Sequence, residues 1–307
     1  MTKKFVVENE FNEVRFDRWF KQKVLDIPQG LIEKLIRKNQ AKINNKKTKS
    51  SYRVKTGDIV EIFSIEKIKK TDKKIITQYK PSIKEKNQYD SFLIEDNENF
   101  IVINKPSGNA VQSGTKSFKN IVDTLRETKY FENSKPFIVH RLDKETSGIL
   151  IVAKNREYAQ LFTSLFRIRK IHKTYLAIAY GEVSKKINTL EDDLTIYEKE
   201  KKIVQKAISH LKVLKHSSNY SLVELKPITG RKHQLRKQLY NIGNSIVGDD
   251  KYFIKKAKDS IKSKHLMLHA YEIKFMINNV RYNFKAEFDN NFKNFLDKKN
   301  LNIFKSI

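Results

Sequence analysis

Residues 139–150 read Val-His-Arg-Leu-Asp-Lys-Glu-Thr-Ser-Gly-Ile-Leu, a polar segment with an apolar run on either side. The preceding run covers residues 136–139 and the following run covers residues 149–153, and each is typical of a short β-strand. Gly148 ends the polar segment and is free to take a positive φ in a turn. The pattern predicts two strands that hold a loop, and Asp143 lies on that loop, where catalytic groups are often found.

Asp143 has two interpretations on turn chemistry alone. In most proteins an aspartate in a turn that contains Ser and Thr simply accepts backbone hydrogen bonds, and this structural role is the more common one. The catalytic interpretation depends on whether the surrounding sequence matches a known active site.

The charge of the chain indicates what it binds. The chain has 307 residues and a net charge of +28, from 63 Lys and Arg against 35 Asp and Glu. A surplus of this size indicates a polyanionic partner, of which nucleic acid is the simplest. An AT-rich genome would favour lysine over arginine, but it does not by itself explain more basic than acidic side chains. RNA or DNA is therefore the expected partner.

Composition also excludes several classes of protein. Cysteine is absent, which excludes disulfides and cysteine-based metal sites. The seven histidines are scattered instead of standing at zinc-ligand spacing, so we expect no metal. The first ten residues lack the apolar core of a signal peptide, and no run reaches the ~20 apolar residues of a membrane span. A cytoplasmic protein without a membrane partner is the expectation.

The pattern His-Arg-Leu-Asp-x-x-Thr-Ser-Gly at residues 140–148 resembles the active-site motif of the RluA-type RNA pseudouridine synthases. The resemblance implies that Asp143 is the catalytic residue. It also implies that Arg141 occupies the position vacated by a base that has flipped out of its helix. The residues expected to shape the loop are His140, Thr146, Ser147 and Gly148.

Two further motifs carry the same resemblance. Residues 173–181 are similar to the family pattern Lys-x-Tyr-x-Ala-x-x-x-Gly, which implies that Tyr175 lines the active site and takes part in catalysis. Residues 230–236 are similar to Gly-Arg-x-His-Gln-Ile/Leu-Arg, which implies that Arg236 forms an ion pair with Asp143. The Thr-Gly turn and the apolar spacing after it predict a helix with the basic residues in its first two turns. A Gly-x-x-Ile-x-Gly-Asp pattern follows.

Residues expected to bind RNA or to assist base flipping are Arg141, Arg231, His233, Lys105, Arg15, Arg37 and Lys38. Lys105-Pro106 belongs to a motif similar to Lys-Pro-x-Gly and is also expected to support the neighbouring loop. Residues 167–170, at the end of an amphipathic helix predicted over residues 155–170, are a candidate phosphate-contact cluster. The chain departs from the family at Gln112, where histidine is common, and at Lys237-Gln238, where Val-His is usual and where a change would alter RNA contacts.

Residues 14–64 are similar to the S4 RNA-binding domain, with two predicted helices, a basic hairpin and a Gly-Asp before the last strand. Two glycines of that pattern are replaced by Asn39 and Asn45. Asparagine is the non-glycine residue that most readily takes the left-handed conformation, so the turns are still expected.

The resemblance implies an α+β protein. We expect a catalytic domain of pseudouridine synthase type, with a mixed, mainly antiparallel β-sheet and peripheral helices, and a small N-terminal α+β S4-like RNA-binding domain. The expected boundaries are 1–64 for the S4-like domain, with its core at 14–64, 65–90 for a basic linker with a short strand near residues 75–76, and 91–307 for the catalytic domain.

By resemblance, the reaction isomerises uridine to pseudouridine without a cofactor, and Asp143 attacks either the sugar C1′ or the uracil C6. The region of Gln112 and residues 265–269 are most similar to the C-type branch of the family, which implies uridines of 23S rRNA, naked or pre-ribosomal, and we expect a monomer. The alternatives are D-type site specificity or a non-catalytic S4-containing ribosome assembly factor. A glycoside or nucleoside hydrolase would usually need a second carboxylate, which the recognisable motifs lack.

Overall fold

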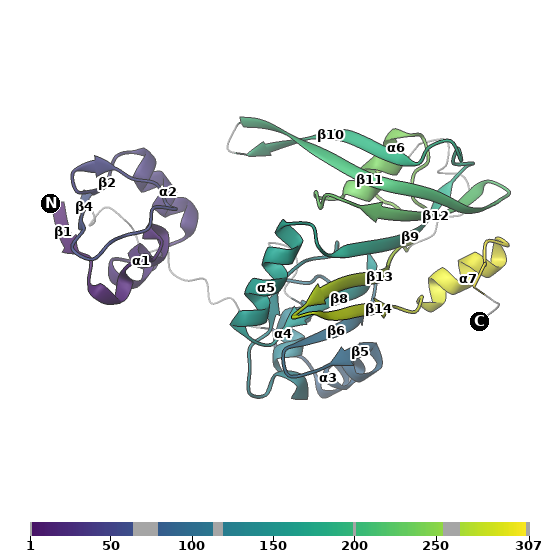
Figure 1. The fold of residues 1–307 in the computed structure, drawn as a ribbon, viewed down its shortest axis with the longest axis horizontal. Helices are drawn as coiled ribbons and strands as arrows, with labels where there is room; N and C mark the ends of the chain where they lie inside the picture. The colour runs from purple at the N-terminus through teal and green to yellow at the C-terminus, as the bar shows by residue number, and fades with distance from the viewer. Residues whose placement is uncertain (1, 64–78, 113–118, 199–200, 254–264, 305–307) are drawn as a thin grey trace. The chain divides into compact units, whose positions relative to one another are not determined.

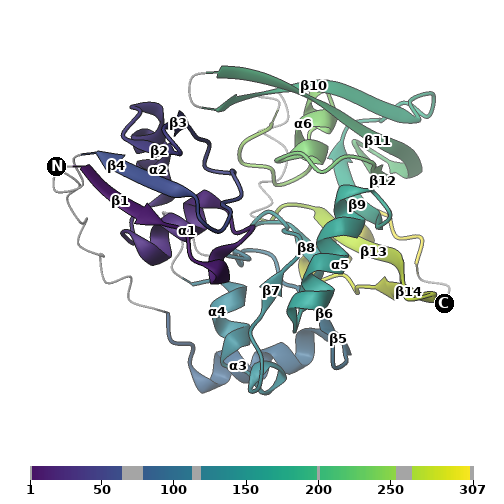
Figure 2. The ribbon, with the colours of Figure 1, turned by 60° about the vertical axis from the view of Figure 1, so that its left-hand side comes forward.

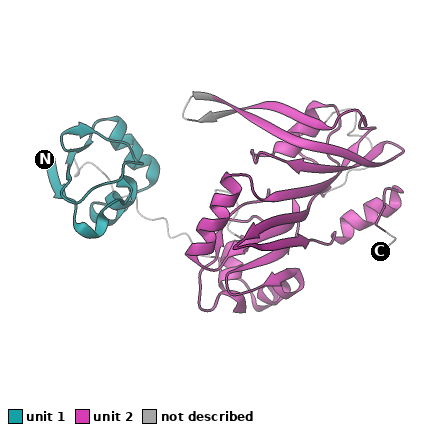
Figure 3. Cartoon of the chain, viewed as in Figure 1, with its two compact units in different colours: residues 1–77 teal, residues 78–307 magenta. Residues whose placement is uncertain are grey.

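The structure is a computed structural model that describes residues 2–63, 79–112, 119–198, 201–253 and 265–304. It forms two compact units, residues 1–77 and 78–307 (Figure 3). No helix in the described part of the chain is long and apolar enough to cross a membrane.

In chain order the elements are β1 (Thr2–Val6), η1 (Asn9–Phe11), α1 (Phe16–Lys23), α2 (Gln29–Arg37), β2 (Ala41–Ile43), β3 (Lys46–Lys47), β4 (Ile59–Phe63), α3 (Ile83–Gln88), η3 (Tyr89–Phe92), β5 (Leu93–Asp96), β6 (Phe100–Lys105), α4 (Ile121–Arg126), η4 (Lys129–Phe131), β7 (Phe137–Ile138), β8 (Ser147–Ala153), α5 (Arg156–Arg167), β9 (His172–Tyr180), β10 (Thr189–Glu198), β11 (Lys201–Ser217), β12 (Tyr220–Pro227), α6 (Gln234–Asn241), β13 (Leu268–Ile277), β14 (Val280–Lys285) and α7 (Asn290–Lys298).

The first unit has a four-stranded antiparallel sheet with strand order β1-β4-β2-β3, together with α1 and α2. Its helices form where apolar residues recur at helical spacing, and they bury Phe16, Trp19 and Ile32 against the sheet. Asn39 and Asn45 both have the left-handed conformation predicted for them, with φ of 55° and 61°.

The core of this unit begins earlier in the chain than expected. Strand β1 pairs with β4 along its whole length, and the Phe5 ring packs edge-on against Trp19 with centroids 6.2 Å apart. Val7 and Phe11 are also buried in this core. The segment before residue 14 is therefore part of the folded unit, because β1 adds an edge strand to the sheet.

The structure contradicts the expected linker over residues 65–90 in the part that it describes, residues 79–90. A helix, α3, begins after Ser82, whose side chain accepts from the backbone N–H of Glu85 while the Glu85 carboxylate accepts from the backbone N–H of Ser82. This reciprocal capping box stabilises a helix start that apolar periodicity does not reveal. Tyr89, next in the chain, is buried. The strand expected near residues 75–76 lies outside the described residues.

The second unit is built on a ten-stranded mixed sheet whose order is β10-β11-β12-β9-β13-β8-β6-β5, with β14 paired to β13 and β7 to β8 (Figures 1 and 2). Every pair is antiparallel except β13 with β8. The predicted α+β architecture with a mixed, mainly antiparallel sheet is confirmed. In the sequence, β8 is close to a continuous apolar run, and all its residues are buried, as expected for a central strand.

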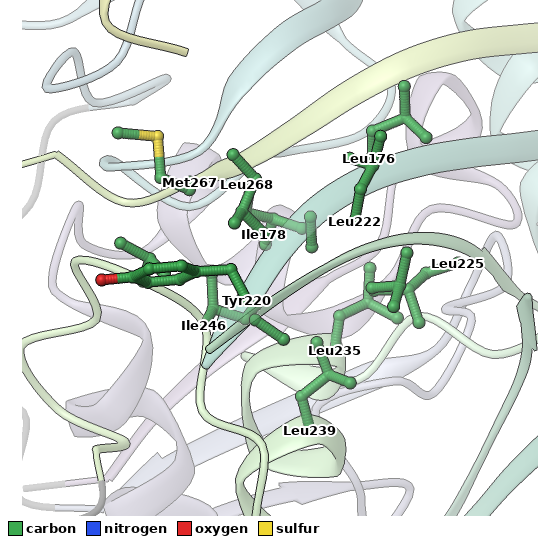
Figure 4. Packing of buried hydrophobic residues seen from close by; sticks show 14 of the residues in the cluster. Leu176, Ile178, Tyr220, Leu222, Leu225, Leu235, Leu239, Ile246, Met267 and Leu268 are labelled. Carbon is green, nitrogen blue, oxygen red and sulfur yellow. The ribbon is translucent and has the colours of Figure 1, made fainter. Parts of the chain in front are cut away.

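The largest core of the second unit fixes α6 to the sheet. Leu235 and Leu239 of α6 lie near Leu225 of β12 (Figure 4), and they share one buried cluster with Leu176 and Ile178 of β9. These side chains are buried, and each buried leucine or isoleucine contributes about 2 kcal/mol of hydrophobic free energy. The packing therefore holds α6 at a fixed position against the sheet.

Candidate active site

The loop that carries Asp143 joins β7 to β8, and its C-terminal end, beside β8, is held in place. The backbone N–H of Thr146 donates to the carbonyl oxygen of Asp143 (3.1 Å), which closes a turn directly after the aspartate. Gly148 has φ +106°, and a Cβ atom there would lie 2.3 Å from the carbonyl oxygen of Ala270. Glycine is required at this position because β13 passes too close to β8 for any side chain.

Lys105 supports the loop from the end of β6. Its side chain is fully buried, and its Nζ donates to the carbonyl oxygens of Pro106 (2.9 Å), Asn109 (3.0 Å) and Lys144 (3.0 Å). Burial lowers the pKa of this ammonium to about 7. A buried lysine with three carbonyl partners cannot reach RNA. The prediction that Lys105 binds RNA is wrong, and its contacts are those of a loop support.

Two histidines make structural contacts around the same loop. Nε2 of His140 accepts from the backbone N–H of Ile151 (2.9 Å), and its ring stacks on Phe166 with centroids 4.8 Å apart. Burial lowers the pKa of His140 to about 3, so the ring is neutral and acts as an acceptor. Ser147 Oγ lies 2.9 Å from Nδ1 of His269. These contacts fit the loop-shaping role proposed for His140 and Ser147.

The second wall of the site is the basic segment that leads into α6. The helix begins at Gln234, so Arg231 and His233 precede it, and the prediction that they lie in its first two turns is wrong. The Gln234 side chain accepts from Thr229 Oγ1 (2.8 Å) and from the backbone N–H of Arg231 (3.0 Å), which holds these residues in a turn. His233 takes a left-handed conformation with φ 53° directly before the helix.

Arg236 has a tighter partner than the one predicted. Its Nε and Nη2 donate to the two carboxylate oxygens of Asp249, both at 2.6 Å, whereas its Nη1 lies 3.9 Å from Oδ2 of Asp143. Burial opposes the charge, but Asp249, Asp143 and Asp250 together raise the pKa of Arg236. Sequence reasoning missed Asp249, and the available signal was its place at the end of the Gly-x-x-Ile-x-Gly-Asp pattern.

His233 also faces the catalytic candidate. Its Nε2 lies 3.8 Å from Oδ1 of Asp143, and its Nδ1 lies 3.1 Å from the hydroxyl of Tyr252. Burial lowers the pKa of His233, although the charge of Asp143 opposes that shift. The imidazole is therefore mainly neutral at neutral pH and stands between a carboxylate and a phenol. Sequence reasoning had assigned His233 only to RNA contact.

Asp143, Tyr175, His233 and Arg236 line one cavity of about 780 Å³. Asp143 is the only acid among the described residues that line it. Burial, followed by the charge of Asp143, raises the pKa of Tyr175, so its hydroxyl keeps its proton at neutral pH. The volume suits a single nucleotide unit. The cationic lining residues are Arg141, Arg167, Arg169, Lys173, Arg231, Lys232 and Arg236.

A family model described as RNA pseudouridylate synthase matches residues 99–241. The chain is 36% identical over 275 residues to the ribosomal large subunit pseudouridine synthase C of Rickettsia felis, which covers 84% of this chain and 87% of the relative. It is 35% identical over 282 residues to the protein of the same name from Buchnera aphidicola subsp. Baizongia pistaciae, with 88% of each chain covered. The chain belongs to the RNA pseudouridylate synthase family.

The synthase also resembles a solved structure, human RNA pseudouridylate synthase domain containing 4. The TM-score is 0.58 at 25% identity, and the match covers 72% of this chain and 98% of that one. The matched family region, residues 99–241, contains Asp143, Tyr175 and Arg236. The family and enzyme class expected from the sequence are confirmed: the protein is an RNA pseudouridine synthase, an isomerase.

Three of the predicted RNA-binding residues belong to the first unit. Arg15, Arg37 and Lys38 are exposed in the first unit, and Arg15 donates to the Asp17 carboxylate at 2.6 Å and 3.1 Å. Gln238, expected to alter RNA contacts, is instead fully buried, and its amide donates to the carbonyl oxygens of Leu190 and Ala207. That expectation is wrong because this face of α6 packs against the sheet.

Proposed function

We propose that this synthase isomerises uridines of large-subunit ribosomal RNA to pseudouridine, with Asp143 as the catalytic carboxylate. The relatives named as ribosomal large subunit enzymes support the substrate. One observation carries the role of Asp143. Its carboxylate lines a cationic cavity with Arg236 and His233 at 3.9 Å and 3.8 Å, and no side-chain hydrogen bond within 3.5 Å engages it among the described residues. A carboxylate oxygen that faces Arg236 and His233 but accepts a hydrogen bond from neither is available to attack.

The reaction breaks the N1–C1′ bond, turns the uracil and joins C5 to C1′, with the C5 proton lost and N1 protonated. The atoms balance without any net transfer of electrons. Asp143 serves as the nucleophile, on C1′ or on C6, and the guanidinium of Arg236 lies 3.9 Å from its carboxylate. Tyr175 stacks on the uracil, and its hydroxyl takes part in proton transfer at C5.

Entry of the uridine requires that it leaves its stack. Arg141 is exposed on the loop two residues before Asp143 and lines the cavity, so its planar guanidinium is placed to fill the vacated position. Arg167 and Arg169, at the end of α5, also line the cavity and meet the phosphates that flank the flipped nucleotide. An rRNA substrate also implies the cytoplasmic location expected from the sequence.

We also propose that residues 1–77 act as an S4-like RNA-binding module. The order of its elements and the left-handed Asn39 and Asn45 match the expected pattern, and Arg37 and Lys38 are exposed at the end of α2. Deleting residues 1–77 is expected to weaken RNA affinity or alter site choice more than it slows the chemical step. Equal losses in binding and single-turnover rate, with circular dichroism unchanged for the rest, would contradict the module.

The direct test of the function uses purified protein and large-subunit rRNA, with pseudouridine mapped by nucleotide position. Wild-type protein is expected to form pseudouridine. Asp143→Asn is expected to bind RNA with unchanged affinity and unchanged salt dependence but to form none. An Asp143→Asn protein that still turns over would refute the role of Asp143. RNA binding by an inactive wild-type protein would favour the alternative of a non-catalytic assembly factor.

A further inference from the structure

We propose that Asp249 is the positioning residue that fixes both groups facing Asp143, and this inference rests on the catalytic role proposed for Asp143. Through one carboxylate, Asp249 holds Arg236 directly and holds His233 by way of Tyr252. Each of the two held side chains then presents one nitrogen to Asp143, at 3.9 Å and 3.8 Å.

The contact with Arg236 is buried and bidentate. The side chain of Asp249 is fully buried, and its two oxygens accept from Nε and Nη2 of Arg236, each at 2.6 Å. Paired hydrogen bonds of this kind fix the plane of a guanidinium. Asp250 also meets Nη2, at 3.2 Å, but it is 84% exposed. The plane of Arg236, and the direction of its remaining Nη1, are therefore set by Asp249.

The contact with His233 passes through a turn. Oδ1 of Asp249 accepts from the backbone N–H groups of Lys251 (2.9 Å) and Tyr252 (2.8 Å), which folds residues 249–252 into a side-chain-capped turn. The turn brings the Tyr252 hydroxyl to within 3.1 Å of Nδ1 of His233. The Tyr252 ring centroid lies 5.4 Å from the Arg236 guanidinium carbon, within cation–π range.

The arrangement controls how strongly Asp143 is held. Because Asp249 neutralises Arg236, the guanidinium stays 3.9 Å from Asp143 instead of forming the close ion pair. Without the charge of Asp249, Arg236 would turn to Asp143 and tie up the attacking oxygen. The charged or titratable groups that interact with Asp143 are Arg236, His233, Tyr175 and Lys105.

The test compares Asp249→Asn with Asp250→Asn in the full chain, on rRNA that the wild-type protein converts. Asp249→Asn is expected to lower kcat at least about tenfold with little change in RNA affinity, since a misplaced catalytic group slows chemistry more than binding. Asp250→Asn removes the same charge from an exposed position and is expected to lower kcat much less than Asp249→Asn does.

The split between kcat and RNA affinity separates this role from a merely structural one. Lower yield or a lower melting temperature, with the kcat of the wild type, would overturn the proposal. So would equal effects of Asp249→Asn and Asp250→Asn. If Asp249→Asn does not fold, Tyr252→Phe decides: it keeps the Asp249–Arg236 pair and removes the hydroxyl from His233. A reduced kcat with unchanged RNA affinity supports the proposal, and an unchanged kcat overturns it.

Failure of the inference differs from failure of the function. An active wild type, an inactive Asp143→Asn and a fully active Asp249→Asn would overturn the role of Asp249 alone. Turnover by Asp143→Asn would remove the proposed role of Asp143, and the role of Asp249 would be overturned with it.

Discussion

The hydroxyl of Ser147 lies 2.9 Å from Nδ1 of His269, and Nε2 of the same ring lies 3.2 Å from the carbonyl oxygen of Ala286. The two residues face each other across β8 and β13, in the parallel register of these strands. The contact joins the end of the catalytic loop to a strand far along the chain. The C-terminal end of the loop that carries Asp143 is therefore part of the core of the second unit. This anchoring holds the nucleophile in a precise position.

The buried His269 makes stability depend on pH. Burial lowers the pKa of His269 to about 4, against about 6.5 in an unfolded chain. The unfolded state therefore binds more protons between these values, and the free energy of unfolding falls as the pH drops below about 6.5. From pH 7 to pH 5 this residue is expected to cost about 2 kcal/mol. Urea unfolding of the wild type and of His269→Gln, followed by circular dichroism, measures the difference. The same pH dependence in both proteins would show that His269 does not titrate on unfolding.

Gly148→Ala is expected to destabilise the second unit by about 3 kcal/mol or more, because the new Cβ would meet the Ala270 carbonyl at a positive φ. The matched control is Gly108→Ala, which also has positive φ but open space around it, with an expected cost of about 1 kcal/mol. Thermal unfolding by circular dichroism measures both. Trp19 fluorescence reports the first unit alone, since it is the single tryptophan, and should not change. Equal costs at the two glycines would contradict the close approach.

Lys105→Met keeps the length of the side chain but leaves three carbonyl oxygens without the buried donor that they share. The expected loss is about 3 kcal/mol in the free energy of unfolding. Lys144→Met, at an exposed lysine of the same loop, is the stability control and is expected to cost little. Folded Lys105→Met protein should bind RNA as the wild type does. A protein of normal stability with weakened RNA binding would instead restore Lys105 as an RNA contact.

Tyr175→Phe removes the hydroxyl of Tyr175 and keeps its ring. The ring remains able to stack on the uracil, so RNA affinity should not change, while loss of the proton-transfer group should lower kcat by about 100-fold. Tyr180→Phe, on the same strand but not among the residues that line the cavity, is the matched control and should keep the wild-type kcat. Single-turnover conversion of rRNA measures the chemical step. If both variants convert RNA at the wild-type rate, the hydroxyl of Tyr175 has no part in catalysis.

The sequence determined the strands and the loop that carry Asp143, because apolar alternation and turn residues act over a few neighbouring positions. The same local chemistry predicted the left-handed Asn39 and Asn45. The resemblance of the motifs also implied that Asp143, Tyr175 and Arg236 share one site, and all three line the same cavity.

The tertiary structure alone decided which groups pair across the site. From the sequence, Lys105 is expected to be a surface cation, yet its ammonium donates to three carbonyl oxygens. Arg236 lies closer to Asp249 than to Asp143. Helix α6 begins only at Gln234, because the Gln234 side chain accepts a hydrogen bond that holds the preceding residues in a turn. A hydrogen bond depends on where distant segments meet to within a few tenths of an ångström. Periodicity tells which side chains are buried, whereas only the packed chain determines the partner that each buried polar group finds.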